Sequence, residues 1–264
     1  MLGRLSNVYF DLTREFNHQG PVVALASGQA VVYYRLALAS KDGDWILRES
    51  DAACRRVREV LAAHGATYRL SAPLDVRWLR GGWSSHFEFF LEGHRRVRCD
   101  FFSRAPRIPL ADIELLFREA SGPLVVIGLE PLIQMKRTQR AKDYPIIAEL
   151  ARLLPPEREI ELTTDPDRII ELARAFGEGS PRPCVRAARQ GTSDELVELE
   201  LVKEMRRDRH RDQERVRRYT RAAGPYLAGF LAAGIDRLPL PEAHERACEL
   251  AVGCLPVEPP DDGG

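Results

Sequence analysis

The sequence predicts an α+β protein, with a mixed β-sheet core flanked by helices and a helical C-terminal domain after it. Short apolar runs of strand type alternate with helical periodicities up to residue 154, whereas only helical patterns follow Pro155-Pro156. The 264 residues are 44% hydrophobic and 30% charged, which is typical of a globular protein. We therefore expect a core domain over residues 1–154, a helical domain over 155–255 and a disordered tail over 256–264.

The first domain is expected to begin with a helix and to continue as strands and helices in alternation. Ser50 is a candidate N-cap, and Val57, Val60 and Leu61 follow at helical spacing, which predicts a helix that ends before Gly65. Gly81-Gly82 predicts a turn. Helices are expected over residues 1–18, 30–38, 50–64 and 110–120. Strands are expected over residues 22–26, 42–47, 74–79, 86–91, 96–102 and 124–127.

The second half of the chain is expected to be helical. Residues 130–154 have a helical pattern with a break before Pro145, because proline interrupts a helix. The glycine- and proline-rich stretch 177–193 predicts a loop. Further helices are expected over residues 165–176, 194–221, 222–234 and 240–252.

Three aspartates are the strongest candidates for a functional site. Asp42 and Asp44 are two residues apart, and on a strand this spacing places both carboxylates on the same face. Asp100 lies in a second strand-like run and could bring a third carboxylate to them. Convergent carboxylate oxygens suit Mg²⁺, which proteins hold with a few carboxylates and the phosphates of a substrate.

A turn of small residues precedes the acidic pair. Val22 to Ala26 has the composition of a buried strand, and the turn Ser27-Gly28-Gln29-Ala30 leads into the expected helix. Backbone N–H groups at the start of a helix favour phosphate. The order of strand, turn, helix and acidic strand therefore predicts a triphosphate site.

Residues 22–154 resemble the nucleotidyltransferase superfamily, in its minimal and abortive-infection-toxin-like branches. The turn at Ser27-Gly28-Gln29 is similar to the glycine turn of the family, Asp42 and Asp44 to its acidic pair, and Asp100 to its third acid. Segments 128–137 and 140–144 are similar to its C-terminal signature. The resemblance implies that Asp42, Asp44 and Asp100 hold Mg²⁺, or Mn²⁺ in its place, and act in catalysis. It also implies that Ser27, Gly28, Gln29 and Lys136 bind the nucleoside triphosphate (NTP).

The chain departs from the family pattern at three positions. Ser-Gly-Gln replaces the usual Gly-Ser of the turn, which removes or displaces a hydroxyl that helps to hold the triphosphate. Gly43 stands between the two acids, where an aliphatic residue is common, and Arg35 stands where a glycine is common. These departures bear on activity more than on fold.

Lys136, Arg140 and Asp143 are spaced so that an unbroken helix would place them on one face. The resemblance places Lys136 near the triphosphate, where it would neutralise the charge that develops during transfer. Alternatively, they form a solvated basic face, and Asp143 caps the helix that begins near Pro145. The basic run 206–218 has two interpretations as well. It is an RNA- or DNA-binding surface, or a solvated helix in which Asp208, Asp212 and Glu214 pair with arginines.

Composition narrows the class of protein. The net charge is zero, so the chain as a whole lacks the strongly basic character of many nucleic-acid-binding proteins. No apolar run has the length of a membrane span, so we expect no membrane association. No signal peptide is evident, and the five cysteines form no Cys-x-x-Cys pair. We therefore expect neither a zinc site nor a disulfide framework, and we expect a cytoplasmic protein. The histidines make no His-x-x-x-His pair, so a histidine–metal site is not expected.

The leading hypothesis is a Mg²⁺-dependent enzyme that moves a nucleoside monophosphate from an NTP to a hydroxyl acceptor and releases pyrophosphate. RNA, a protein or a small hydroxylated molecule could be the acceptor. The alternative is a non-catalytic nucleotide-binding or protein-interaction module with the same fold. A toxin of a toxin–antitoxin pair, acting on tRNA, is a third hypothesis, and it predicts growth arrest on expression.

Overall fold

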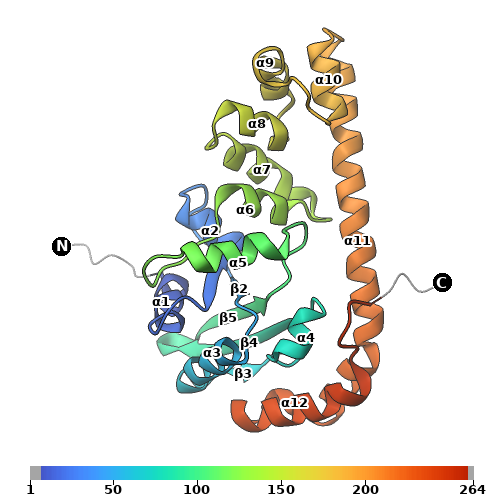
Figure 1. Ribbon diagram of the computed structural model, residues 1–264. Coiled ribbons are helices and arrows are strands. Elements are labelled where there is room, and N and C mark those ends of the chain that lie inside the picture. The colour runs from blue at the N-terminus through green and yellow to red at the C-terminus, as the bar shows by residue number, and fades with distance from the viewer. Residues whose placement is uncertain (1–6, 261–264) are drawn as a thin grey trace. The chain divides into compact units, whose positions relative to one another are not determined.

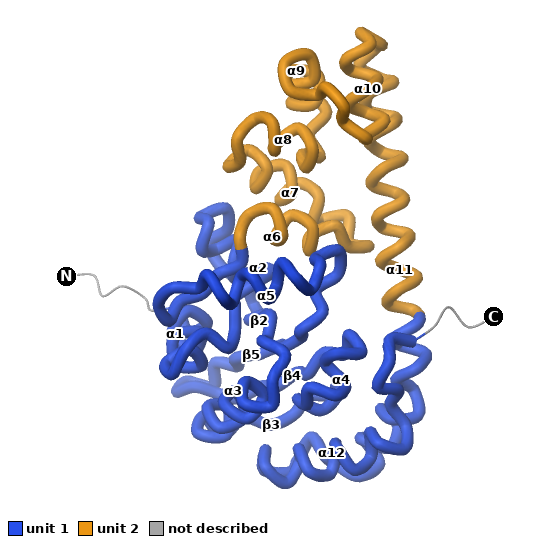
Figure 2. The backbone as a smooth tube through the Cα atoms, in the orientation of Figure 1, with its two compact units in different colours: residues 1–127, 218–264 blue, residues 128–217 orange. Residues whose placement is uncertain are grey.

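The computed structural model describes residues 7–260 of the chain (Figure 1). The chain forms two compact units, and each is described by itself (Figure 2). Unit 1 contains residues 1–127 and 218–264, and unit 2 contains residues 128–217. The predicted division at residues 154 and 155 does not coincide with these boundaries, since it lies inside unit 2. The C-terminal segment, expected to belong to a separate helical domain, returns to unit 1 instead.

A five-stranded mixed sheet forms the centre of unit 1, in the order β1-β2-β5-β4-β3. The pair β2–β5 is parallel and the other pairs are antiparallel. The strands are β1 (Val23–Ala26), β2 (Gly43–Leu47), β3 (Thr67–Tyr68), β4 (Ser84–Leu91) and β5 (Arg95–Phe102). The strand expected over 124–127 is reduced to a single bridge between Val126 and Leu25. The predicted α+β class with a mixed sheet is confirmed.

Helices flank this sheet (Figure 1). Those of unit 1 are α1 (Val8–Phe16), α2 (Ser27–Tyr33), α3 (Asp51–Ala63), α4 (Val76–Arg80), α5 (Leu110–Glu119) and α12 (Leu240–Cys254), with short 3-10 helices over Glu92–His94 and Ile235–Arg237. The predicted helix after Ser50 is confirmed, and the Ser50 side chain accepts a hydrogen bond from the backbone N–H of Ala53. Of the helix expected over residues 1–18, residues 1–6 lie outside the described part of the chain.

The strand expected over 74–79 is wrong, because α4 occupies most of it. Leu74, Val76 and Trp78 are buried at alternate positions, which is the pattern that indicated a strand. Asp75 caps the helix by accepting a hydrogen bond from the backbone N–H of Arg77. A helix of only five residues is too short to show its own periodicity, so the alternation was misleading.

One face of the sheet carries the aromatic core. Trp45 stacks on Phe101 with ring centroids 5.2 Å apart, and Phe16 from α1 packs edge-on against both rings. The Trp45 Nε1–H donates to Thr13 Oγ1 at 2.9 Å, which satisfies the polar atom of a completely buried side chain. Because successive strand residues point to opposite faces, the residues between these aromatic side chains lie on the other face.

Unit 2 is helical. Its helices are α6 (Leu129–Lys136), α7 (Tyr144–Ala151), α8 (Pro156–Leu162), α9 (Pro166–Phe176), α10 (Pro183–Arg189) and the first part of α11 (Asp194–Ala232), with a 3-10 helix over Ala141–Asp143. The loop expected over 177–193 contains α10, whose Cys184 and Val185 join a small core with Ile160, Ile169 and Val197. This burial explains why a segment with a loop-like composition folds.

The long helix α11 replaces two expected helices, over 194–221 and 222–234, and continues through Pro225. Tyr226 and Phe230 are completely buried in the core of unit 1, so packing holds the helix beyond the proline. The tail is also ordered at its start, because the Pro256 carbonyl accepts a hydrogen bond from Trp83 Nε1 at 2.8 Å. Residues 261–264 of the expected disordered tail lie outside the described residues. Within residues 7–260, no helix has both the length and the apolar composition needed to cross a membrane.

Candidate active site on the polar face of the sheet

The sheet brings the predicted acids to one face. In the parallel pair β2–β5, Asp44 lies directly opposite Asp100. Their neighbours Trp45, Cys99 and Phe101 are completely buried on the aromatic face, which leaves the two aspartates half-buried on the opposite one. Asp42 precedes β2 by one residue and shares this face by the same alternation.

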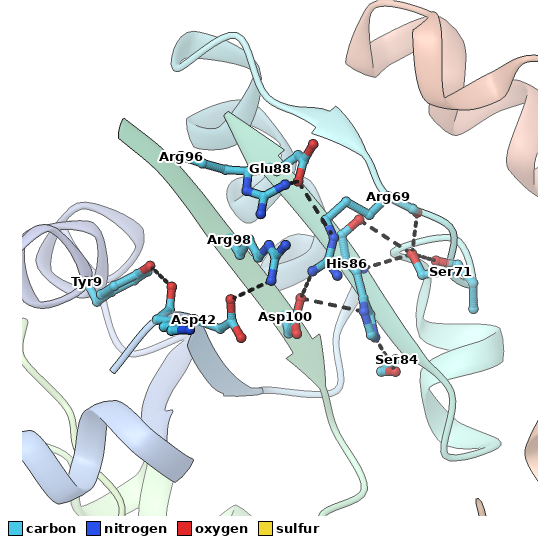
Figure 3. A network of polar contacts seen from close by, with 12 residues as sticks. Tyr9, Asp42, Arg69, Ser71, Ser84, His86, Glu88, Arg96, Arg98 and Asp100 are labelled. Atoms are coloured by element: carbon cyan, nitrogen blue, oxygen red, sulfur yellow. Dashed lines mark hydrogen bonds and ion pairs between the residues drawn. The ribbon is translucent and has the colours of Figure 1, made fainter. Parts of the chain in front are cut away.

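Asp100 is a strongly perturbed carboxyl group. Its Oδ1 lies 3.2 Å from Arg69 Nη1 and 3.6 Å from His86 Nδ1 (Figure 3). Burial raises its pKa from 3.8 to about 6; the charge of Asp42 adds to the rise, and Arg69 and Arg98 oppose it. A carboxyl with a pKa near neutrality can accept or release a proton under physiological conditions.

His86 is a residue of this site that sequence reasoning missed. It is the antiparallel partner of Asp100 on β4, and its Nε2 lies 2.8 Å from the Ser84 hydroxyl. Burial, and then the charge of Arg69, lower its pKa to about 4, so the imidazole is neutral at pH 7. The alternation of residues along β4 is the only sequence signal for the face on which the His86 side chain lies. Nothing local in the sequence indicates that β4 pairs with β5.

A basic pocket adjoins Asp42, and this feature was missed as well. It has a volume of about 360 Å³, and its charged lining is Lys41, Asp42, Arg95, Arg96 and Arg98. Arg98 Nη1 lies 3.4 Å from Asp42 Oδ1 (Figure 3). The Tyr9 hydroxyl donates a hydrogen bond to the Lys41 carbonyl at 2.6 Å, which fixes the backbone at this side of the pocket. Four cations and one carboxylate make the basic pocket attractive to phosphate groups.

The turn Ser27-Gly28-Gln29 opens α2, and its geometry explains the glycine. A Cβ atom on Gly28 would lie 2.2 Å from Ser40 Oγ, so a larger residue here would require the Ser40 side chain to move. No side chain caps α2. The side chain of Gln29 is buried and accepts from Asn7 Nδ2 at 3.1 Å and donates to the Ser40 carbonyl at 2.9 Å. Gln29 therefore ties the turn to α1 and to the segment before β2, and nucleotide binding by this turn stays a prediction.

Lys136 belongs to unit 2, and the expected unbroken helix through Asp143 is wrong, because α6 ends at Lys136. The following turn nevertheless gathers the three residues. Asp143 lies 3.9 Å from Lys136 Nζ and accepts from Arg140 Nε at 2.9 Å. Asp143 occupies the N-cap position of α7, as the alternative expected, but its side chain makes no capping hydrogen bond. Contact between the buried Lys136 and a triphosphate stays a prediction.

The acids in the basic run 206–218 are paired within unit 2. Asp212 is 3% exposed, accepts from the Gln139 backbone N–H at 2.9 Å and lies 3.0 Å from Arg215. Arg137 lies 2.8 Å from Asp208. These contacts favour the ion-paired helix over a nucleic-acid surface.

Comparisons with known proteins add one structural likeness. No protein-family model and no curated protein matches the chain. A crystal structure of a "putative nucleotidyltransferase" from H. pylori is similar at 14% identity and a TM-score of 0.39, over 81% of this chain and 98% of that one. This likeness is too low to carry function.

Proposed function

We propose that the protein is a nucleotidyltransferase that uses Mg²⁺, or Mn²⁺ in its place. The observation that carries the proposal is the group of three aspartates on the polar face of the sheet, with the basic pocket beside them. Carboxylates to hold a divalent cation and cations to hold phosphates are the two components that phosphoryl transfer needs.

The carboxylates fit such a cation. Asp42 and Asp100 each use Oδ1 in an ion pair, with Arg98 and Arg69 respectively, and both carboxylates lie on the polar face of the sheet. The mutual repulsion of Asp42 and Asp100, which contributes to the raised pKa of Asp100, is relieved when a divalent cation binds. Asp42, Asp44 and Asp100 would hold the ion, which supplies a positive charge to the reacting phosphate.

The residues of the chain then have separate tasks. The basic pocket holds the phosphates of the NTP, and Asp100 accepts the proton of the acceptor hydroxyl. The acceptor oxygen forms a bond to the α-phosphorus, the bond from that phosphorus to the bridging oxygen breaks, and pyrophosphate leaves. The acceptor is RNA, a protein or a small hydroxylated molecule.

A non-catalytic nucleotide-binding or interaction module is the second candidate, and two observations favour it. Arg98 and Arg69 already neutralise part of the charge of Asp42 and Asp100. Gln29 stands in the turn where the sequence departs from the family pattern, and its side chain is already hydrogen-bonded to Asn7 and to the Ser40 carbonyl.

Label transfer distinguishes the two candidates. The protein is incubated with Mg²⁺, each NTP radioactively labelled at the α-phosphate, and cell RNA, cell protein and small-molecule extracts as acceptors. We expect transfer by the wild type and none by Asp42→Asn, with Asp112→Asn on the exposed face of α5 as the control that keeps activity. Binding of NTP without any transfer supports the module.

A further inference from the structure

A second group of metal-binding side chains lies in unit 1, outside the candidate active site. His244 and Cys248 are one turn apart on α12 and therefore share a face. Asp75, at the start of α4, faces them. One nitrogen of His244, the Cys248 sulfur and one Asp75 oxygen all lie within 4.8 Å of one another, and all three residues are half-buried.

A buried tyrosine orients the histidine. The Tyr68 hydroxyl lies 2.9 Å from His244 Nδ1, and the planes of the two rings are 7° from parallel. Tyr68 is 1% exposed, and its oxygen also accepts from the Leu74 N–H at 2.9 Å, so it cannot turn away. The other nitrogen, Nε2, lies 3.6 Å from Cys248 Sγ. A histidine whose second nitrogen is held by an oxygen is the usual arrangement at protein metal sites.

An arginine holds the third group in this structure. Arg77 Nε lies 3.0 Å from Asp75 Oδ1 and its Nη2 lies 2.9 Å from Oδ2. The Arg77 side chain is 52% exposed and its guanidinium carbon lies 4.4 Å from the centroid of the Trp78 ring, so moving it into solvent breaks this contact as well as the ion pair. The guanidinium therefore supplies a positive charge that a metal ion could supply instead.

We infer that Asp75, His244 and Cys248 bind Zn²⁺, which displaces Arg77 from the carboxylate. Nitrogen, sulfur and oxygen donors are the set that zinc prefers, with a water molecule as fourth ligand. Cys248 binds as a thiolate and releases its proton to solvent, so the thiolate and the carboxylate together balance the charge of the ion. The bound ion would fasten α12 to the start of α4, two segments far apart in the sequence.

The site escaped sequence reasoning because its ligands follow neither of the spacings that were considered. Cys-x-x-Cys and His-x-x-x-His are absent, whereas His244-x-x-x-Cys248 is a mixed pair with the same one-turn separation. Its third ligand, Asp75, comes from a distant segment that only the tertiary structure brings close.

Cobalt binding tests this site without reference to transferase activity. Full-length, metal-free protein is titrated with Co²⁺, whose thiolate complexes absorb by charge transfer from sulfur. We expect one Co²⁺ per chain with this absorption, and its loss on addition of Zn²⁺. Cys248→Ser should abolish the absorption, and Cys254→Ser, the matched cysteine at the end of the same helix, should keep it. No sulfur absorption in the wild type, or the same absorption in Cys248→Ser, would overturn the inference.

Two variants that keep all three ligands make the test independent of folding failures. Tyr68→Phe should weaken Co²⁺ binding about 10- to 100-fold, as loss of an outer-shell partner does. Arg77→Gln should tighten binding, because the competing cation is gone while the backbone N–H that Asp75 caps remains. Unchanged affinity in both variants contradicts the inference.

Discussion

Arg35 shows how a single residue departs from what the backbone requires. The backbone N–H groups of Arg35 and Leu36 donate to the carbonyls of Val32 and Val31, which closes α2 with the usual C-terminal pattern. This pattern needs a left-handed residue, and Arg35 has a φ of 63°. Glycine adopts this conformation without steric cost, whereas arginine does not.

We therefore expect Arg35→Gly to raise the free energy of unfolding by about 0.5–1 kcal/mol, measured by urea denaturation. Arg35→Ala is the matched control, because it removes the same exposed side chain and leaves the strain in place. An equal gain in both variants would attribute the effect to the side chain and refute the backbone argument.

The cations of the basic pocket give a second prediction about single residues. In the described structure, Lys41 and Arg95 have no carboxylate partner, so they are available to a ligand. Lys41→Gln or Arg95→Gln should weaken NTP binding about 10-fold, the loss expected for one charged hydrogen bond. Equilibrium binding of labelled NTP measures this effect without turnover, and Lys142→Gln in unit 2 is the control. Full affinity in both pocket variants would place the phosphates elsewhere.

At the scale of elements, α11 retains a proline in its interior. Pro225 has no N–H to donate to the Arg221 carbonyl, and its ring crowds that group, yet Tyr226 and Phe230 anchor the helix on its far side. Local propensity thus predicted two helices, and burial of aromatic side chains overrode it.

Replacing this proline should restore the missing hydrogen bond. Because Pro225 is exposed, Pro225→Ala loses no packing and should raise the free energy of unfolding by about 1–3 kcal/mol. Pro241→Ala in the first turn of α12, where a proline costs no hydrogen bond, should give no such gain. Chemical denaturation of both variants beside the wild type decides between these outcomes.

At the scale of the whole molecule, the half-buried Asp100 makes stability depend on pH. Its pKa is raised to about 6 in the folded chain, so between about pH 4 and 6 the folded state binds more protons than the unfolded state. The stability contributed by this group therefore rises as the pH falls through this window. Above pH 6, the ionised Asp100 destabilises the fold, by on the order of 2–3 kcal/mol.

Asp100→Asn removes this ionisation and should be more stable than the wild type at pH 8, with the difference vanishing near pH 4. Urea denaturation of the two proteins at both pH values measures it, and other titrating groups cancel in the comparison. A difference that is constant with pH would mean that Asp100 is not desolvated as described. The same variant should lose label transfer, so stability and activity move in opposite directions.

The local pattern of the sequence determined much of unit 1. Alternation placed Asp42 and Asp44 on one face of a strand, the cap at Ser50 located the start of α3, and the order of elements indicated an α+β fold with a mixed sheet. These features depend on residues a few positions apart, where the geometry of a helix or a strand leaves little choice.

Only the tertiary structure decided which distant residues meet. The strand order pairs Asp100 with Asp44 on one side and with His86 on the other, brings Arg69 to the same carboxyl, and returns α12 to Asp75. Burial also overruled local signals, by turning residues 76–80 into a helix and carrying α11 through Pro225. Pairing and packing depend on the free energy of the whole chain, which no window of sequence contains.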